Sequence, residues 1–272
     1  MLFQEQVRKV KQAAPKLAAT TNEQRNAALT AVREALLQHQ AEIFEANKQD
    51  LAQAEADGVS GPVRKRLKFD EGKLRDVTAG ISDLIKMEDP LFQTQFAREL
   101  DEGLVLKRVT CPIGVIGVIF EARPDALVQI SALCIKSGNC VILKGGREAL
   151  RSNKKLFDII HEAIIDAGLP ADSMMQLEAR SEINELLECH ESVDLLIPRG
   201  SNAFVQYIMN HTKIPVMGHA DGICHIYVDK DADLAKAVPI IVDAKTQYVS
   251  ACNTVETLLV HEVIKDQLLP ML

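Results

Sequence analysis

The stretch "CPIGVIGVIFEARPD" (Cys111–Asp125) decides how this chain folds. Its core, "PIGVIGVIF", is an almost unbroken apolar run, as expected of a parallel strand that is buried on both faces. The next stretch, "DALVQISALCIKSG", has helical spacing and a glycine stop at Gly138. A buried strand that leads into a helix is the basic unit of an α/β sheet.

The same unit recurs along the chain. "NCVILKGG" predicts the next strand, and "REALRSNKKLFDIIHEAIIDAGLP" predicts a long helix that ends at Gly-Leu-Pro. Further strands are predicted at "SMMQLE", "VDLLIPRGS", "IPVMG" and "ICHIYVD", with helices between them or after them. This alternation predicts an α/β protein with an open, mostly parallel sheet.

The segments before this sheet differ in pattern. In "TTNEQRNAALTAVREALLQHQAEIFEANKQDLAQAEADG", Thr21 or Asn22 can cap a helix, and alanine and leucine recur at spacings of three and four. Gly58 ends this run, so residues 1–90 predict a helical layer. After it, "FARELDEGLVLKRVT" alternates around Gly103, which predicts a hairpin at about residues 95–109.

Composition narrows the function classes. The chain has 272 residues, 47% of them hydrophobic, and a net charge of −7 from 38 acidic and 31 basic residues. The acidic balance argues against nucleic acid or an acidic membrane as a partner. The sequence has no apolar run of roughly 18 residues and no signal-like start, so we expect a cytoplasmic protein without a membrane span. Six cysteines without a C-x-x-C pair predict free thiols and no metal site.

Ligands of open α/β sheets bind beyond the carboxyl ends of the strands. Three predicted strand ends carry suitable residues: Arg123 in "FEARPD", Lys144 and Arg147 in "LKGGRE", and Arg199, Gly200 and Ser201 in "IPRGSN". A Gly-Ser before a helix can bind a phosphate or can simply cap the helix, and there is no G-x-G-x-x-G or Walker sequence. Basic residues at two strand ends favour a phosphate-bearing cofactor or substrate.

Cys252 differs from the other five cysteines. It lies between Ser250 and Asn253 in a predicted loop that joins a helix to a strand, whereas the others lie in or beside apolar segments and are expected to be buried. A thiolate attacks activated carbonyls well and leaves readily. The local pattern leaves both a nucleophile and a buried structural thiol open for Cys252.

Five stretches together resemble the gamma-glutamyl phosphate reductase family of the aldehyde dehydrogenase superfamily: "CPIGVIGVIFEARPD", "SGNCVILKGGREA", "LIPRGS", "IPVMGHADGICHIYVD" and "AKTQYVSACNTVETLLVH". The resemblance implies an aldehyde dehydrogenase-like α/β fold with a Rossmann-like NADP-binding domain. That domain would span residues 1–247, with the helical layer at 1–90, an oligomerisation hairpin at 95–109 and the βα sheet at 112–247. Residues 248–272 would begin a catalytic domain. Family members continue beyond Leu272, so we expect a C-terminally truncated chain.

The resemblance also implies an activity. It is the NADPH-dependent reduction of L-glutamyl 5-phosphate to L-glutamate 5-semialdehyde and phosphate, in proline biosynthesis, through a thioester on Cys252. By the same resemblance NADPH would bind Lys144, Arg147, Gly200 and Ser201, and the substrate would meet Arg123 and Asn253. Lys144 would meet the adenosine ribose, Arg147 the 2′-phosphate, and the Gly-Ser turn the diphosphate.

Partners and alternatives follow from the same family. A homo-oligomer is expected at full length, and glutamate 5-kinase is a candidate partner. The glutamate base of oxidising aldehyde dehydrogenases has no counterpart after "IPVMGH", as suits an enzyme that gains nothing from activating water. Two other interpretations stay open: an oxidising aldehyde dehydrogenase, and an inactive truncated chain that binds the cofactor without turnover.

Overall fold

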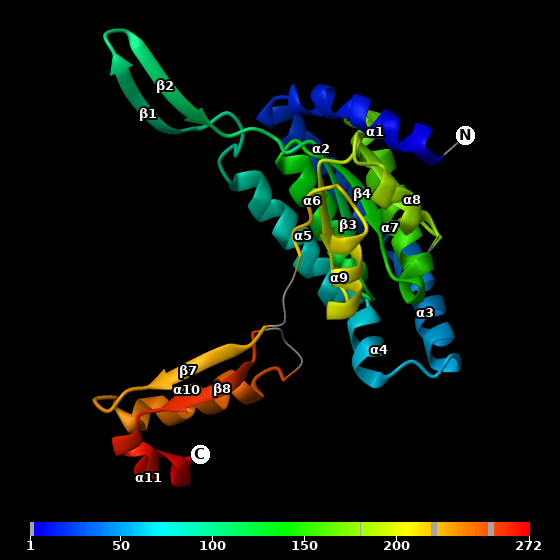
Figure 1. Cartoon of the computed structure of the whole chain (residues 1–272). Helices are drawn as coiled ribbons and strands as arrows, with labels where there is room; N and C mark the ends of the chain where they lie inside the picture. The colour runs from blue at the N-terminus through cyan, green and yellow to red at the C-terminus, as the bar shows by residue number, and fades with distance from the viewer. Residues whose placement is uncertain (1–2, 180, 219–221, 250–252) are drawn as a thin grey trace. The chain divides into compact units, whose positions relative to one another are not determined.

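The computed structural model describes residues 3–179, 181–218, 222–249 and 253–272 (Figure 1). The chain forms two compact units, Met1–Gly218 and His219–Leu272, and each is described by itself. The sequence placed a boundary between a cofactor domain and a catalytic domain at 247/248. That boundary divides the chain by function and stays a prediction.

The centre of the first unit is a parallel sheet. Its strands lie in the order β5 (Met174–Leu177), β4 (Cys140–Lys144), β3 (Val115–Ile119) and β6 (Leu195–Pro198). Every residue of β3 and β4 is buried, because helices cover both faces of the sheet. The predicted open α/β sheet is confirmed, and so are these two strands as its fully buried members.

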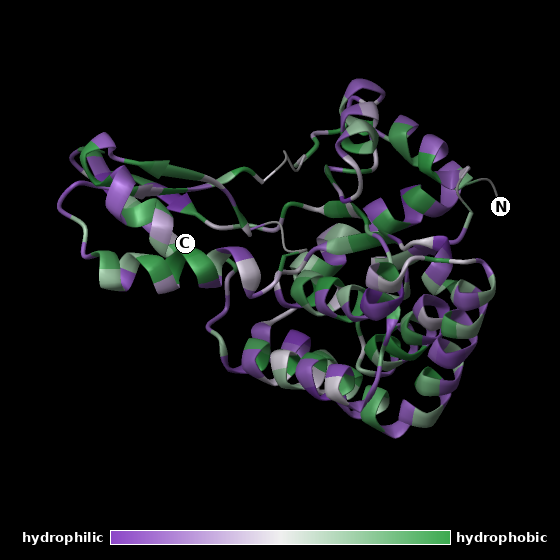
Figure 2. Ribbon diagram, turned by 90° about the horizontal axis from the view of Figure 1, so that it is seen from below, coloured by the Kyte–Doolittle hydropathy of each residue, from purple (hydrophilic) through white to green (hydrophobic). Residues whose placement is uncertain are grey.

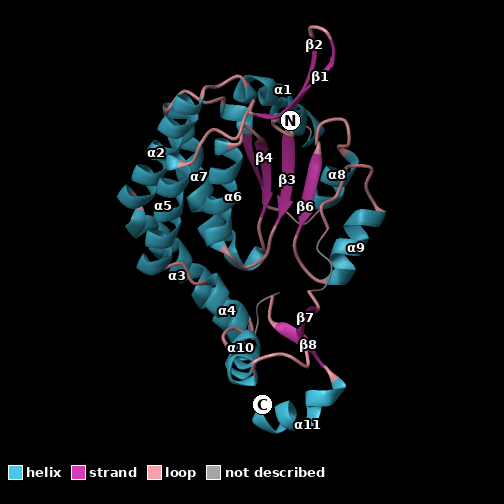
Figure 3. Cartoon of the chain, turned by 90° about the vertical axis from the view of Figure 1, so that its left-hand side faces the viewer, coloured by secondary structure: helices cyan, strands magenta, loops and turns pink. Residues whose placement is uncertain are grey.

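Helices cover the sheet in layers (Figure 3). The connecting helices α6 (Pro124–Lys136) and α7 (Leu150–Asp166) pack on one face, and α1 (Phe3–Ala18) and α8 (Glu182–Glu188) lie on the other. Along their length the helices carry both apolar and polar residues (Figure 2), as expected of helices with one face in the core.

The N-terminal helices do not form one layer. α2 (Asn22–Gln38), α3 (Gln40–Ala56) and α5 (Glu71–Lys86) pack behind α6 and α7, while α1 lies across the sheet from them. Of the two predicted caps, Thr21 and Asn22, it is Thr21 that caps α2, in a capping box with Gln24. A short helix, α4 (Gly61–Leu67), joins α3 to α5.

The predicted hairpin is confirmed. β1 (Thr94–Asp101) and β2 (Leu104–Val109) pair antiparallel around Gly103, whose φ of 76° only glycine adopts readily. The hairpin projects from its unit (Figure 1), and all residues of both strands are exposed. The exposed residues include large apolar side chains, among them Phe96, Leu100, Leu104 and Leu106.

The segment "IPVMG" (214–218) departs from the prediction. It was expected to be a strand, but the structure has only one parallel bridge there, between Val216 and Leu196. Leu196 donates its N–H to the Pro215 carbonyl and accepts from Met217. Pro215 has no N–H to extend the ladder, which explains why this segment forms a single bridge and no strand. The helix that precedes this segment, α9 (Asn202–Asn210), was predicted correctly.

The second unit is a small βαβ fold. β7 (Cys224–Val228) and β8 (Val255–Val260) pair in parallel, joined by α10 (Leu234–Thr246), and α11 (Lys265–Leu268) follows. Its core is formed by Val228, Ile241, Ile264 and Leu268. In the described ranges of both units, no helix has the length and apolar character that a membrane span needs.

Candidate active site

The four strands of the parallel sheet end at the same level. Leu177 pairs with Lys144, Lys144 with Ile119, and Ile119 with Pro198, and each is the last residue of its strand. Since the strands are parallel, the loops that follow them emerge at one edge of the sheet. This carboxyl edge therefore carries the predicted residues Arg123, Lys144, Arg147, Gly200 and Ser201.

Lys144 is the last residue of β4 and is only 7% exposed. Its Nζ donates to the carbonyl oxygen of Gly145 at 2.7 Å. Burial lowers the pKa of Lys144, while the carboxylates of Glu182 and Glu148 act in the opposite direction. An ammonium group has three N–H donors. This lysine thus keeps donors for a hydroxyl or phosphate.

The loop after β4 lies directly against Asn153. A Cβ at Gly145 would be 2.1 Å from Asn153 Nδ2 and 3.2 Å from Phe120 Cε2, so only glycine fits there. Asn153 is 1% exposed, and its Oδ1 is buried without a hydrogen-bond partner in the part of the chain that the structure describes. Arg147, two residues after Gly145, is exposed and begins the turn before α7. Its guanidinium can therefore reach a ligand from solvent.

Behind this loop, the start of α7 is held by the N-terminal helices. Asp50 accepts hydrogen bonds from the backbone N–H and the hydroxyl of Ser152, at 2.8 and 2.7 Å. Asn47 donates to Ser152 and to the Leu67 carbonyl and accepts from the N–H of Phe69. These contacts fix the helix that carries Asn153. Sequence reasoning missed the contacts of Asp50 and Asn47 with Ser152, because these partners lie about a hundred positions apart.

At the end of β6, Arg199 donates its N–H to the Ile119 carbonyl at 2.8 Å. Gly200 follows with a φ of 154°, and a Cβ there would lie 3.0 Å from the Phe204 ring. The Ser201 hydroxyl accepts from the N–H of Phe204 at 3.3 Å and so caps α9. The capping alternative for this turn is therefore observed. The hydroxyl hydrogen of Ser201 still allows donation to a ligand.

At the end of β3, two cations share one carboxylate. Arg123 Nη2 lies 2.9 Å and Lys73 Nζ 3.2 Å from the same oxygen of Asp125, whose side chain is 3% exposed. Burial works to raise the pKa of Asp125, but the hydrogen bonds and charges of Arg123 and Lys73 outweigh it, so that pKa lies below its ordinary value. Two cations and one carboxylate thus lie together at the end of β3. Lys73 lies in α5, and sequence reasoning missed it.

The cysteines of the first unit divide by burial. Cys134, Cys140 and Cys189 are buried, as predicted, but Cys111 is exposed, so the prediction was wrong for that residue. Cys111 follows a hairpin that is exposed on both faces, and its apolar neighbours there do not enclose it. Burial raises the pKa of Cys134 and of Cys140 to about 12, so both thiols stay protonated at neutral pH. Neither has the character of a nucleophile.

The predicted nucleophile belongs to the second unit. Cys252 lies outside the described residues, and Asn253, which follows it, is exposed. The Thr254 hydroxyl donates to the Tyr248 carbonyl at 2.7 Å, and Lys245 Nζ donates to the Val255 carbonyl at 2.9 Å. These two bonds connect the segments on either side of residues 250–252.

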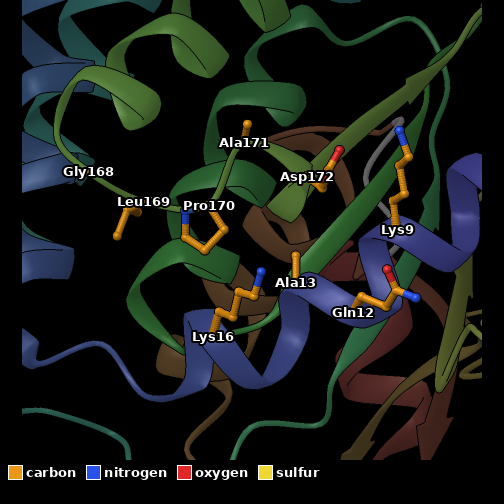
Figure 4. A pocket seen from close by; sticks show the side chains of 9 residues that line it. All are labelled: Lys9, Gln12, Ala13, Lys16, Gly168, Leu169, Pro170, Ala171 and Asp172. Carbon is orange, nitrogen blue, oxygen red and sulfur yellow. The ribbon is translucent and has the colours of Figure 1, made fainter.

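A cavity of about 290 Å³ lies elsewhere in the first unit (Figure 4). Lys9 and Lys16 of α1 line it together with residues 168–172, which precede β5. It therefore lies toward the amino-terminal edge of the sheet and contains none of the predicted site residues. Within the described ranges, no three His, Cys, Asp or Glu side chains gather as they would around a metal ion.

Known proteins match the whole chain. It is 56% identical over 272 residues to the gamma-glutamyl phosphate reductase of Pelotomaculum thermopropionicum and 54% identical over 262 residues to gamma-glutamyl phosphate reductase 1 of a Synechocystis species. The chain spans 63% and 60% of the length of these relatives.

Solved structures agree with the fold. The crystal structure of the Thermotoga maritima gamma-glutamyl phosphate reductase has a TM-score of 0.94 at 36% identity, over 98% of this chain and 65% of that one. A propionaldehyde dehydrogenase of Rhodopseudomonas palustris, 18% identical, shares the fold with a TM-score of 0.65 over 99% of this chain and 57% of its own. The model of the aldehyde dehydrogenase family matches residues 3–272. The chain belongs to the aldehyde dehydrogenase family.

Proposed function

We propose that this chain carries the NADPH site and the nucleophile of a gamma-glutamyl phosphate reductase, which reduces L-glutamyl 5-phosphate to L-glutamate 5-semialdehyde and phosphate in proline biosynthesis. The observation that carries the proposal is the 56% identity to such a reductase over all 272 residues. It includes the three loops at the carboxyl edge of the sheet and the segment around Cys252.

The residues at the carboxyl edge fit a phosphorylated dinucleotide. Lys144 has unused donors for ribose hydroxyls, and the exposed Arg147 suits a 2′-phosphate, which favours NADPH. Gly200 and Ser201 precede α9, whose positive end suits the diphosphate. The buried, unsatisfied Oδ1 of Asn153 beside Gly145 also marks this edge as a place for a ligand. When bound, NADPH supplies the hydride.

Arg123 would act on the substrate. Its guanidinium and the ammonium of Lys73 both meet the carboxylate of Asp125, so two cations lie at the end of β3, where they suit the negative charge of an acyl phosphate. We assign to Arg123 the stabilisation of charge on the substrate's carbonyl or phosphate oxygens. Asn253 is the candidate donor on the side of the nucleophile.

Cys252 would carry the acyl group. Its thiolate attacks the acyl carbon, a C–S bond forms, the C–O bond to phosphate breaks, and phosphate leaves. Hydride addition to the thioester carbon gives the alkoxide form of a thiohemiacetal. Its collapse breaks the C–S bond, releases the semialdehyde and restores the thiolate.

The hairpin supports a homo-oligomer. Phe96, Leu100, Leu104 and Leu106 are each about half exposed, which is unusual for large apolar residues on one small element. Sedimentation velocity would give the mass, and a monomer at all concentrations would contradict the assignment. Glutamate 5-kinase is a candidate partner, and the cytoplasm the proposed location, by family analogy.

The test is the reverse reaction. The purified chain is given glutamate semialdehyde, phosphate and NADP⁺, and NADPH formation is followed by absorbance. We expect phosphate-dependent NADPH formation that is lost in Cys252→Ala, because the thioester cannot form without the thiol. The matched control is Cys111→Ala, an exposed cysteine of the first unit, which should keep the activity.

The other outcomes discriminate among the alternatives. NADPH formation without phosphate would indicate an oxidising aldehyde dehydrogenase. Binding of NADPH without turnover would indicate a cofactor-binding chain that lacks catalysis by itself. Activity that survives Cys252→Ala would rule out the proposed nucleophile.

A further inference from the structure

Asn153 combines complete burial with an unmet hydrogen bond. It is the fourth residue of α7, 1% exposed, and its Oδ1 is buried without a partner among the described residues. Its Nδ2 lies 2.1 Å from where a Cβ of Gly145 would be. The amide thus supports the backbone of the loop after β4 and leaves its own acceptor unused.

The neighbouring polar groups are satisfied. Ser152 bonds to Asp50 through both its N–H and its hydroxyl, and Asn47 uses its amide in three hydrogen bonds. A buried acceptor without a partner destabilises the fold, and an apolar side chain of the same shape avoids that cost. Packing alone therefore gives no reason for an asparagine at position 153.

The missing donors lie in the adjacent loop. In the described part of the chain, the backbone N–H groups of Gly145 and Gly146 donate to no acceptor. The carbonyl of Gly145 is held by Lys144 Nζ. If the ammonium of Lys144 instead donates to a ribose hydroxyl, the carbonyl of Gly145 loses this hydrogen bond. The Gly145–Gly146 peptide can then rotate so that an N–H of this segment donates to the side-chain amide of Asn153.

We propose that Asn153 is a positioning residue of the nucleotide site, whose Oδ1 accepts a backbone N–H from the Gly145–Gly146 segment when nucleotide is bound. This rests on the proposed role of Lys144 and Arg147 in binding NADPH. The hydrogen bond fixes the loop between these two residues. Asn153 then acts on the nucleotide through the loop and does not touch it.

The test compares two buried asparagines. Asn153→Leu keeps the volume and removes the amide, so we expect an unchanged or higher melting temperature and NADPH binding about tenfold weaker in fluorescence titration. Asn139→Leu is the matched control. Asn139 is 6% exposed, but its amide is satisfied by Gly114 and Ser137 at the amino-terminal edge. This variant should melt earlier and bind NADPH as the wild type does.

The remaining outcomes separate the inference from the proposed function. Wild-type affinity in Asn153→Leu would overturn the positioning role alone, and so would a lower melting temperature with unchanged affinity. No NADPH binding by the wild type would overturn the proposed function and this inference with it. If Asn153→Leu does not fold, Asn153→Ala, which removes the same amide without adding volume, should show the weakened binding.

Discussion

The two edges of the parallel sheet differ in how the hydrogen bonds of their buried polar groups are satisfied. At the amino-terminal edge, Asp194 accepts from Lys11 Nζ at 2.6 and 2.7 Å and from the N–H of Val115 at 2.8 Å. Asn139 there accepts from the N–H of Gly114. At the carboxyl edge, the buried Oδ1 of Asn153 has no partner in the described ranges.

The contrast indicates which edge serves stability and which serves binding. A fully satisfied polar network rigidifies a fold, whereas a buried unsatisfied acceptor reduces its stability unless a ligand or a rearrangement completes it. Substitutions at the amino-terminal edge should therefore lower stability and leave nucleotide binding intact. Substitutions at the carboxyl edge should change stability less and weaken the binding of nucleotide or substrate.

The largest effect on stability is expected from Asp194→Ala. It removes the partner of Lys11 and leaves the N–H of Val115 without an acceptor at the start of a buried strand. The expected loss is about 2 to 3 kcal/mol in the free energy of unfolding, measured by urea denaturation at pH 7. NADPH affinity of the folded protein should not change.

Lys11→Met is the matched control for this variant. It removes one partner of Asp194 but keeps the bond to Val115, and Lys11 is 39% exposed, so the expected loss is below about 1 kcal/mol. Equal losses of stability in both variants would show that Asp194 stabilises the fold through its ion pair with Lys11 and not through its hydrogen bond to Val115. Weaker NADPH binding in either variant would contradict the inference that the amino-terminal edge serves stability alone.

A smaller effect is expected from Asp125→Asn at the carboxyl edge. Stability should fall by about 1 kcal/mol at pH 7, because the ion pairs of Asp125 with Arg123 and Lys73 are partly exposed to solvent. The larger consequence should be functional. A loosened Arg123 should raise the KM for phosphate in the reverse reaction by about tenfold, with a smaller change in kcat.

The pH dependence gives a second readout for Asp125. Its pKa in the folded protein lies below the ordinary value of 3.8, so the stability it contributes is present above that value and is lost as pH falls through the lower, folded pKa. The difference between wild type and Asp125→Asn should therefore shrink below pH 3.8. If the stability difference between wild type and Asp125→Asn grew below pH 3.8, the ion pairs of Asp125 would not be its cause.

Local pattern sufficed to predict much of this fold. The apolar runs of β3 and β4 predicted strands buried on both faces, and Gly103 predicted the hairpin turn. Thr21, which caps α2, was one of the two residues predicted for that cap. Each of these signals lies within a few residues of the element that it specifies. The carboxyl-edge positions of Lys144 and Ser201 followed from the strand ends alone.

The features that were missed depend on distant partners. Lys73 reaches Asp125 across 52 positions, and Asp50 reaches Ser152 across 102. No local signal marks such pairs. The prediction of a strand at "IPVMG" was wrong because it relied on apolar content and gave too little weight to Pro215, which has no N–H for a ladder. Asn153 was read as part of a helix, since only the packed structure shows that its amide lacks a partner.

The smallest change in stability is expected from Lys144→Met, which tests the carboxyl edge directly. Methionine keeps the length of the stem and removes a charge whose burial is unfavourable, so the free energy of unfolding should stay within about 1 kcal/mol of wild type at pH 7. NADPH affinity should fall at least about tenfold, because a charge-assisted donor to the ribose is lost.

The sign of the pH effect separates burial from other causes. Burial lowers the pKa of Lys144 in the folded protein below its ordinary value of 10.5. At a pH between the folded pKa and 10.5, the unfolded chain therefore holds more of this proton than the folded protein does. The wild type should therefore gain stability relative to Lys144→Met as the pH rises toward 10.5, as measured by urea unfolding across that range. A wild type that loses stability there would mean that Glu182 and Glu148 outweigh burial. Lys144 would then be a stabilising ion-pair residue, and the contrast between the two edges would not extend to it.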